Sequence, residues 1–242
     1  MDKVSEYTNK IRNLLIESAD ELTKEKVLRL TSGVKCIGVS VPKIRQIAKD
    51  FKVEFANLDF GLICEIADRL FKEECREEIL IAIFIIAQQK KNFSKLDWGR
   101  ITIWLKHLDN WETCDQLSSN VVTPIIVKNP DWLGKLFELT NSDNKWERRF
   151  AVATVANINH GGRAYPKETF WICKPLLTDK ETIVTKAVGW AMREISKKCP
   201  EETFDFLKEN LEIMPKRLLK ESSELLPEKE KNEINKKPIN DY

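Results

Sequence analysis

The sequence predicts an all-α protein made of many helices joined by short connections. Apolar residues recur at spacings of three and four along almost the whole chain, which is typical of amphipathic helices. Signals for strands are weak, because there is no Asn-Gly or Asp-Gly turn and no sustained alternation of apolar and polar residues. The chain has 242 residues with 42% hydrophobic residues, 8 glycines and 9 prolines, so it can bury a sizeable core and is not a disordered or collagen-like chain.

Three segments illustrate the helical pattern in chain order. Apolar stripes are predicted at residues 11–19, at residues 44–51 and at residues 79–87. Pro42 stands where a proline fits the first turn of the second of these helices. The third segment is apolar on all sides, which predicts a helix buried on most of its surface. The predicted breaks between helices fall at residues 31–38, 129–130, 141–144, 160–166, 178–179 and at Pro215.

A loose internal repeat is visible in the second half of the chain. Asp109-Asn110, Asp143-Asn144 and Asp179 each precede an apolar helix, and the three aspartates are 34 and 36 residues apart. Each aspartate is predicted to cap the start of its helix. A period in the mid-thirties with two helices per unit is typical of an α-solenoid, and the absence of tetratricopeptide or ankyrin signatures favours HEAT-like repeats.

Several classes of protein and site are excluded or disfavoured. The apolar run at 79–87 is far shorter than a membrane helix, and the polar N-terminus does not resemble a signal peptide, so no membrane association is expected. The six cysteines are far apart and form no CxxC pair, which predicts reduced, mostly buried thiols and no metal site. No GxSxG, HExxH or phosphate-binding loop is present, and His160 is predicted to lie in a loop between helices.

The net charge of +2 is uninformative, but basic residues gather in separate segments. The first segment, residues 42–52, contains Lys43, Arg45 and Lys49, and the others are residues 186–198 and 214–220. Such clusters can converge on one surface that binds phosphates. Solvated helix faces with no ligand are the alternative explanation for each cluster.

The three helices of the repeat contain unusual residues at matching depth. Trp111 and Asp115 are four residues apart, and Trp190 and Arg193 are three apart, so each pair shares a helix face. The middle helix contains Trp146 followed by Arg148 and Arg149. If the helices are neighbours, indoles, a carboxylate and guanidiniums can share a cleft. The alternative is that the tryptophans are core residues and the charges lie on the surface.

Four segments of the chain resemble the DNA alkylation-repair glycosylases of the AlkD type. The resemblance spans about residues 5–226 and is strongest in GVSVPKIRQIAKDF (38–51), NWETCDQL (110–117), SDNKWERRFAVA (142–153) and KAVGWAMREISKKCP (186–200). It implies a right-handed superhelix of HEAT-like repeats over residues 1–226 as a single domain. Residues 227–242 are polar and are expected to form an extension or tail.

The resemblance also implies a function. Members of the family bind double-stranded DNA in a basic concave groove and excise cationic alkylated purines, such as N3-methyladenine and N7-methylguanine, without a cofactor or a metal. The protein is expected to be a monomer in a prokaryotic cytoplasm or a eukaryotic nucleus. The implied roles are catalysis for Asp115, Trp111 and Trp190, and DNA binding for Arg149, Arg193, Arg148, Lys43, Arg45 and Lys49.

One departure from the family pattern keeps alternatives open. The family often has an aromatic residue in the helix before the Gly38 segment, whereas residues 26–36 here contain none. Some members bind DNA, or branched DNA, with little glycosylase activity. A non-catalytic HEAT-repeat DNA-binding protein is therefore the first alternative, and a protein–protein scaffold is the second.

Overall fold

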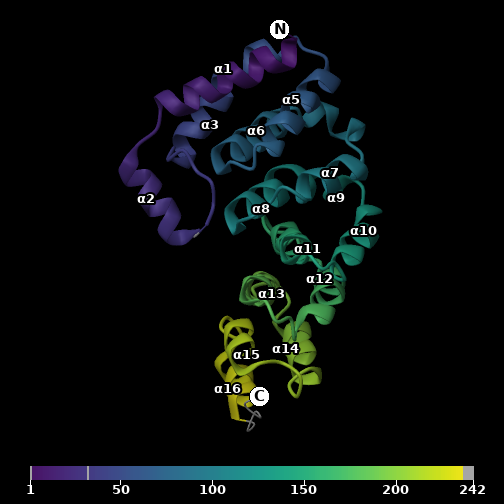
Figure 1. The fold of residues 1–242 in the computed structure, drawn as a ribbon. Helices are drawn as coiled ribbons and strands as arrows, with labels where there is room; N and C mark the ends of the chain where they lie inside the picture. Colours follow the sequence, from purple (N-terminus) through teal and green to yellow (C-terminus); the bar gives the residue numbers. More distant parts are fainter. Residues whose placement is uncertain (1, 32, 237–242) are drawn as a thin grey trace. The chain divides into compact units, whose positions relative to one another are not determined.

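The computed structural model describes residues 2–31 and 33–236, and it confirms the all-α prediction (Figure 1). Within these residues there is no strand, and one isolated bridge pairs Lys35 with Cys75. The α-helices are α1 (Lys3–Glu17), α2 (Glu21–Leu30), α3 (Val41–Asp50), α4 (Lys52–Ala56), α5 (Phe60–Lys72), α6 (Arg76–Gln88), α7 (Trp98–Leu105), α8 (Trp111–Leu117), α9 (Thr123–Lys128), α10 (Trp132–Leu139), α11 (Lys145–Ile158), α12 (Pro166–Cys173), α13 (Thr182–Ser196), α14 (Pro200–Glu209), α15 (Lys216–Ser222) and α16 (Glu228–Lys236). Short 3-10 helices η1 (Lys90–Lys95) and η3 (Lys174–Leu176) and a π-helical segment η2 (Ser118–Val122) complete the order.

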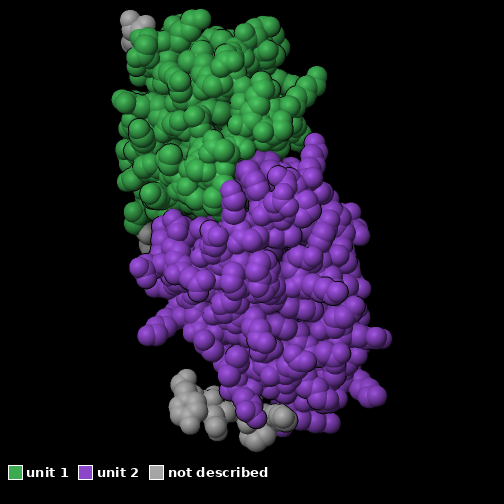
Figure 2. All heavy atoms as spheres, turned by 90° about the vertical axis from the view of Figure 1, so that its right-hand side faces the viewer, with its two compact units in different colours: residues 1–121 green, residues 122–242 purple. Residues whose placement is uncertain are grey.

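The chain divides into two compact units, residues 1–121 and residues 122–242 (Figure 2). The predicted single domain over residues 1–226 stays a prediction. Part of the predicted tail is helical, because α16 begins at Glu228. Residues 237–242 lie outside the described part of the chain.

The first unit is organised around α6, which packs against α1, α3, α5 and α8. The side chains of α6 are buried from Arg76 to Ile86, which confirms the helix predicted to be buried on most sides. α3 begins with Pro42 in its first turn, as predicted, and buries Ile44, Ile47 and Ala48. Its charged residues are exposed, and one of them, Arg45, lies over the ring of Phe84 of α6.

The second unit consists of stacked helical pairs in two rows (Figure 1). Helices α11, α13 and α15 pack successively against one another, and α10, α12 and α14 form the other row. The rows also pack against each other, since α11 contacts α10 and α12, and α13 contacts α12 and α14. The 36-residue repeat between Asp143 and Asp179 therefore corresponds to one helical pair, and the helices that follow these aspartates are neighbours.

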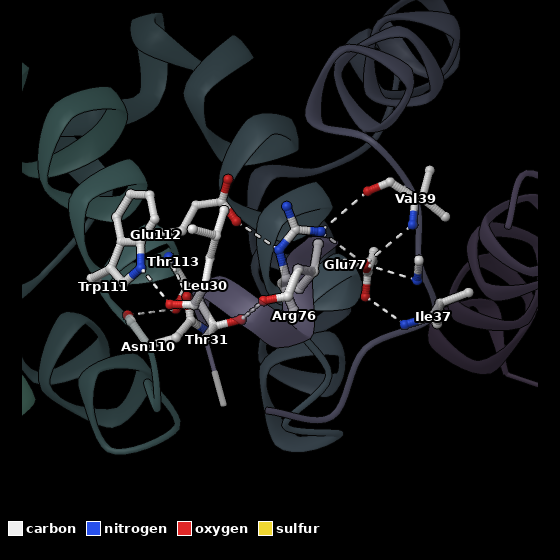
Figure 3. A network of polar contacts seen from close by, with 12 residues as sticks. Leu30, Thr31, Ile37, Val39, Arg76, Glu77, Asn110, Trp111, Glu112 and Thr113 are labelled. Carbon is white, nitrogen blue, oxygen red and sulfur yellow. Dashed lines mark hydrogen bonds and ion pairs between the residues drawn. The ribbon is translucent and has the colours of Figure 1, made fainter. Parts of the chain in front are cut away.

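A buried carboxylate holds the segment that leads into α3 (Figure 3). Glu77 has no exposed surface, and its Oε2 accepts a hydrogen bond from the Ile37 amide at 2.8 Å. Its Oε1 accepts from the amides of Gly38 and Val39 at 3.1 and 3.2 Å. One glutamate from α6 thus satisfies three consecutive backbone donors that would otherwise be buried without partners.

Gly38 is required at the centre of this segment. Its φ of +99° lies in a region that residues with a side chain rarely adopt. A Cβ atom at this position would lie 2.7 Å from Cβ of Lys24 and 2.8 Å from the carbonyl oxygen of Asp20. The Gly38 carbonyl in turn accepts a hydrogen bond from the Asp20 amide at 2.9 Å, which joins the segment to the start of α2.

The six cysteines are all free thiols, as predicted. Cys64, Cys75, Cys114 and Cys173 are buried, whereas Cys36 and Cys199 are partly exposed. Burial raises the pKa of Cys64 to about 11 and that of Cys75 to about 12. No helix in the part of the chain described here has the length and apolar character needed to cross a membrane.

Thiol titration provides a test of this burial pattern. A raised pKa lowers the thiolate fraction at pH 8, and the thiolate is the form that reacts with Ellman's reagent. Partial burial raises the pKa of Cys36 and Cys199 as well, but the reagent can reach them, so we expect these two to react faster in the native protein than the four buried thiols. All six should react quickly in guanidinium chloride. A third fast thiol in the native protein would contradict the packing described.

Replacing Glu77 by glutamine tests the buried carboxylate. The substitution keeps the shape but removes the charge that faces Arg76 and the amides of residues 37–39. Unfolding by urea should show a loss of about 3 kcal/mol, as for other buried charge pairs with one partner removed. The matched control is Glu65→Gln on the exposed side of α5, for which the unfolding midpoint should not change. Equal midpoints for the two variants would refute the assigned role of Glu77.

Candidate functional site

The partly exposed face of α8 contains the predicted indole and carboxylate. Trp111 and Asp115 are both half-buried, while the opposite side of the helix buries Thr113, Cys114 and Leu117. The prediction that the two side chains share a face is therefore consistent with the burial pattern. Trp111 is not a core residue, which removes the alternative explanation for this tryptophan.

Asparagines, not the predicted aspartates, cap two of the three repeat helices. Asn110 accepts a hydrogen bond from the Thr113 amide at 3.0 Å, and Asn144 accepts from the Trp146 amide at 2.9 Å. The third helix, α13, begins after Glu181, which makes no side-chain cap bond. Asp109 and Asp143 each lie one residue before the asparagine that caps, and asparagine serves equally well as a cap. Asp179 accepts from the Glu181 amide at 2.8 Å, one residue before α13 begins.

A buried guanidinium connects α8 to α6 (Figure 3). Arg76 is only 3% exposed, and its Nε donates to Glu112 of α8 at 2.6 Å. Its Nη1 donates to Glu77 at 2.8 Å and to the carbonyl of Val39 at 3.1 Å. Burial by itself lowers the pKa of Arg76, but the carboxylates of Glu112 and Glu77 outweigh it, so the net pKa is raised and the charge is retained.

The start of α8 is also held by the end of α2. The indole Nε1 of Trp111 donates to the carbonyl of Leu30 at 3.4 Å (Figure 3). The Leu30 side chain is 70% exposed and lies in the stretch where the family often has an aromatic residue. The indole is therefore fixed by the backbone of α2, whereas the Leu30 side chain itself is largely accessible.

The predicted basic residues of α3 are exposed, and one of them reaches α8. Lys43, Arg45 and Lys49 all lie on the exposed side of α3. Arg45 donates to the Gln116 side chain at 2.8 Å, and its guanidinium lies 4.0 Å from the ring centroid of Phe84. Arg45 thus joins α3 to the helix that contains the candidate carboxylate.

The two arginines of α11 differ in their environment. Arg149 is 6% exposed and donates from Nη1 to the carbonyl of Ile183 in the first turn of α13, at 2.8 Å. Arg148 forms an ion pair with Asp179 at 2.6 Å and also donates to the carbonyls of Ser142 and Asp143. The carboxylate of Asp179 raises the pKa of Arg148. Both side chains thus connect α11 to the start of the next helical pair.

Trp190 and Arg193 lie on α13 and are both partly exposed. Arg193 pairs with Glu221 of α15 at 2.8 Å and with Glu224 at 3.6 Å. Gly189 makes this approach possible, because a Cβ atom at that position would lie 2.8 Å from the Glu221 side chain. Gly189 of this Gly-Trp-x-x-Arg segment therefore leaves space for the Glu221 side chain, and Arg193 of the same segment binds the Glu221 carboxylate.

Two residues that the sequence did not assign adjoin Trp190. The ring centroid of His160 lies 6.2 Å from that of Trp190, and its Nε2 lies 3.3 Å from Oε2 of Glu194. His160 lies in the loop between α11 and α12, as predicted. The Trp190 indole therefore has a polar residue, His160, on one side.

The predicted site residues belong to both units. Trp111, Asp115 and the basic residues of α3 are in the first unit, whereas Arg148, Arg149, Trp190 and Arg193 are in the second. Their joint role stays a prediction. Among the described residues, no group of three or more histidine, cysteine, aspartate or glutamate side chains could hold a metal ion.

Sequence reasoning missed the residues that support the site. Arg76, Glu77, Glu112 and Glu221 belong to no recognised motif and resemble ordinary helix charges. The one local signal is that Arg76, Glu77 and Glu78 directly precede the most apolar run of the chain, where all three are buried.

Solved structures with the same fold are found in two bacteria. A predicted DNA alkylation repair enzyme from Enterococcus faecalis matches with a TM-score of 0.72 and 17% identity, over 86% of this chain and 96% of that chain. AlkD2 from Streptococcus mutans matches with a TM-score of 0.62 and 22% identity, over 84% of this chain and 99% of that chain. The smu.31 protein from Streptococcus mutans UA159 matches with a TM-score of 0.56 and 20% identity, over 83% and 99%. Among curated proteins, none matches the chain.

The family model described as DNA alkylation repair enzyme matches residues 11–226. This range includes all four motif segments and every candidate residue described above. The chain therefore belongs to the DNA alkylation repair enzyme family.

Proposed function

We propose that the protein is a DNA glycosylase that removes cationic alkylated purines, such as N3-methyladenine and N7-methylguanine, from double-stranded DNA. The single observation that carries the proposal is the partly exposed face of α8 with Trp111 and Asp115, a helix that Arg45 of the basic helix α3 contacts through Gln116. A family whose members act on alkylated DNA supplies the substrate class. We expect a monomer in the compartment that contains the DNA.

The chemistry suits these side chains. An N-alkylated purine already bears a positive charge, so it departs as a neutral base and requires neither a strong acid nor a metal ion. The barrier is instead the positive charge that builds on C1′ of the sugar as the glycosidic bond breaks. A carboxylate at this point stabilises the developing charge and can orient or deprotonate the attacking water. Asp115 is proposed to have this role.

The indoles and the basic residues are proposed to stabilise and position the substrate. The π face of Trp111, and that of Trp190, attracts a cationic sugar with about 0.5–2 kcal/mol each. Arg149 and Arg193 are proposed to bind the phosphates next to the lesion, with Arg148 supporting them through Asp179. Lys43, Arg45 and Lys49 are proposed to contact the backbone further along the duplex.

A DNA-binding protein without glycosylase activity is the second candidate. The observation that favours it is the stretch of residues 26–36, which contacts Trp111 through the Leu30 carbonyl and contains no aromatic residue. Such a protein would retain salt-dependent DNA binding but release no methylated base.

Replacing Asp115 by asparagine tests the catalytic proposal. We expect base release from N7-methylguanine DNA to fall by about 100-fold or more, because the charge that stabilises the sugar cation is lost. DNA affinity should stay constant or rise, since a negative charge near the phosphates is removed. The matched control is Asp50→Asn on the exposed end of α3, which should leave base release unchanged. No base release by the wild-type protein would support the second candidate instead.

Arg193 provides a test of DNA binding. Arg193→Ala should weaken binding to undamaged duplex DNA and reduce the slope of log affinity against log salt by about 0.9, the value of one phosphate contact. Glu221→Gln should act in the opposite direction, because it releases the guanidinium from its carboxylate partner. Arg69→Ala on the exposed surface of α5 is the control. A salt slope equal in Arg193→Ala and wild type would exclude a phosphate contact at Arg193.

A further inference from the structure

A basic cleft lies in the first unit, at the end of α3 that is remote from α8. Its volume is about 740 Å³, and it is formed by α4, the last turn of α6 and η1. Its polar lining consists of three lysines and three carboxamides, with no acidic residue: Lys52, Gln88, Gln89, Lys90, Lys91 and Asn92. The volume lies in the range of small-molecule sites and is larger than a single phosphate needs.

The positive charge of the cleft is not neutralised locally. None of the three lysines forms an ion pair with a residue in the described part of the chain. The acids nearest in sequence have other partners. Asp50 accepts a hydrogen bond from the Gln46 side chain at 2.7 Å, Glu54 of α4 pairs with Lys10 at 3.0 Å, and Asp97 caps α7 through the Arg100 amide. Three like charges in one cleft repel one another, and an anion relieves that repulsion.

The framework of the cleft is ordered by hydrogen bonding. The Gln88 side chain donates to the carbonyl of Ala48 at 2.9 Å, which joins the end of α6 to α3. The backbone N–H of Gln89 donates to the Ile86 carbonyl at the end of α6, and the backbone N–H of Asn92 donates to the Gln89 carbonyl at 2.8 Å. The lysine side chains are long and exposed, so they can converge on a ligand while this framework stays in place.

We propose that this cleft binds phosphate groups. Lysine ammoniums act as point charges toward phosphate, and carboxamide N–H groups supply further donors with no competing negative charge. The phosphates can belong to a free polyphosphate or nucleotide, or to the backbone of DNA that follows the basic face of α3 past Lys49. The proposal concerns a site distinct from Trp111 and Asp115, and it does not depend on base removal.

The test uses two triple variants of the full chain with the same change in charge. The first replaces Lys52, Lys90 and Lys91 by glutamine. The control replaces Lys3, Lys26 and Lys106, which are exposed lysines of the same unit outside the cleft. The probes are tripolyphosphate, followed by titration calorimetry, and an undamaged 20-base-pair duplex, followed by fluorescence anisotropy over a range of salt concentrations. Thermal melts verify that both variants are folded.

We expect the cleft variant to bind tripolyphosphate at least tenfold more weakly, while the control remains close to the wild type. If the duplex is the source of the phosphates, the cleft variant also reduces the salt slope for DNA by about 0.9 for each phosphate that it no longer binds. Weaker tripolyphosphate binding with an unchanged DNA slope identifies a free phosphorylated ligand. Equal behaviour of the two variants toward both probes overturns the proposal. Base release from methylated DNA by the wild type is scored separately, so failure of the glycosylase proposal is distinguishable.

Discussion

The arrangement of the first unit depends on the hydrogen bonds and ion pairs of the Arg76 guanidinium. This guanidinium is buried at the start of the most apolar helix, and it bonds to Glu77, to Glu112 and to the carbonyl of Val39. These partners lie on α6, on α8 and on the segment that leads into α3. One ion thus determines how the helix with Trp111 and Asp115 lies against the helix with the basic face.

The net energy of such a cluster is modest, because desolvation of the charges offsets most of their attraction. Its effect is on specificity of packing. Apolar contacts between α6 and α8 would tolerate sliding by a turn, whereas the bond from Arg76 to Glu112 exists in one register only. The same holds for Glu77, whose two oxygens match three consecutive amides of a segment with a left-handed glycine at its centre.

The candidate DNA contacts of the two units differ in how they are held before any ligand binds. Lys43 and Lys49 of α3 are exposed, and Arg45 touches only Gln116 and the ring of Phe84. Arg148 and Arg193 are paired with carboxylates. A phosphate that binds Arg193 competes with Glu221 for the guanidinium. The free energy of phosphate binding at Arg193 is therefore the difference between the free energies of the two ion pairs. In the proposed function, long-range attraction of DNA would come chiefly from α3 and the cleft at its end, and local discrimination from the paired arginines.

The sequence predicted what depends on local pattern. The spacing of apolar residues located α3 and the buried α6, and the 36-residue offset correctly made α11 and α13 neighbours. Two of the caps were predicted one residue early, because aspartate and asparagine compete as caps and are adjacent at 109–110 and 143–144. The third was predicted two residues early, because α13 begins after Glu181. The partners of Arg76 and Arg193 could not be predicted, since Glu112 and Glu221 are 36 and 28 residues away and their approach is a property of helix packing. Whether Trp190 acts with Trp111 depends on packing at still longer range.

The absence of a side chain at Gly189 determines how closely Glu221 of α15 approaches α13. A single methyl group on α13 at this position would collide with the Glu221 side chain of α15. An alanine at 189 would therefore require the Glu221 side chain to adopt another rotamer, and the arginine four residues later would then lose this carboxylate from its present position. The electrostatic state of this arginine thus depends on the volume of residue 189 as well as on the charge at 221.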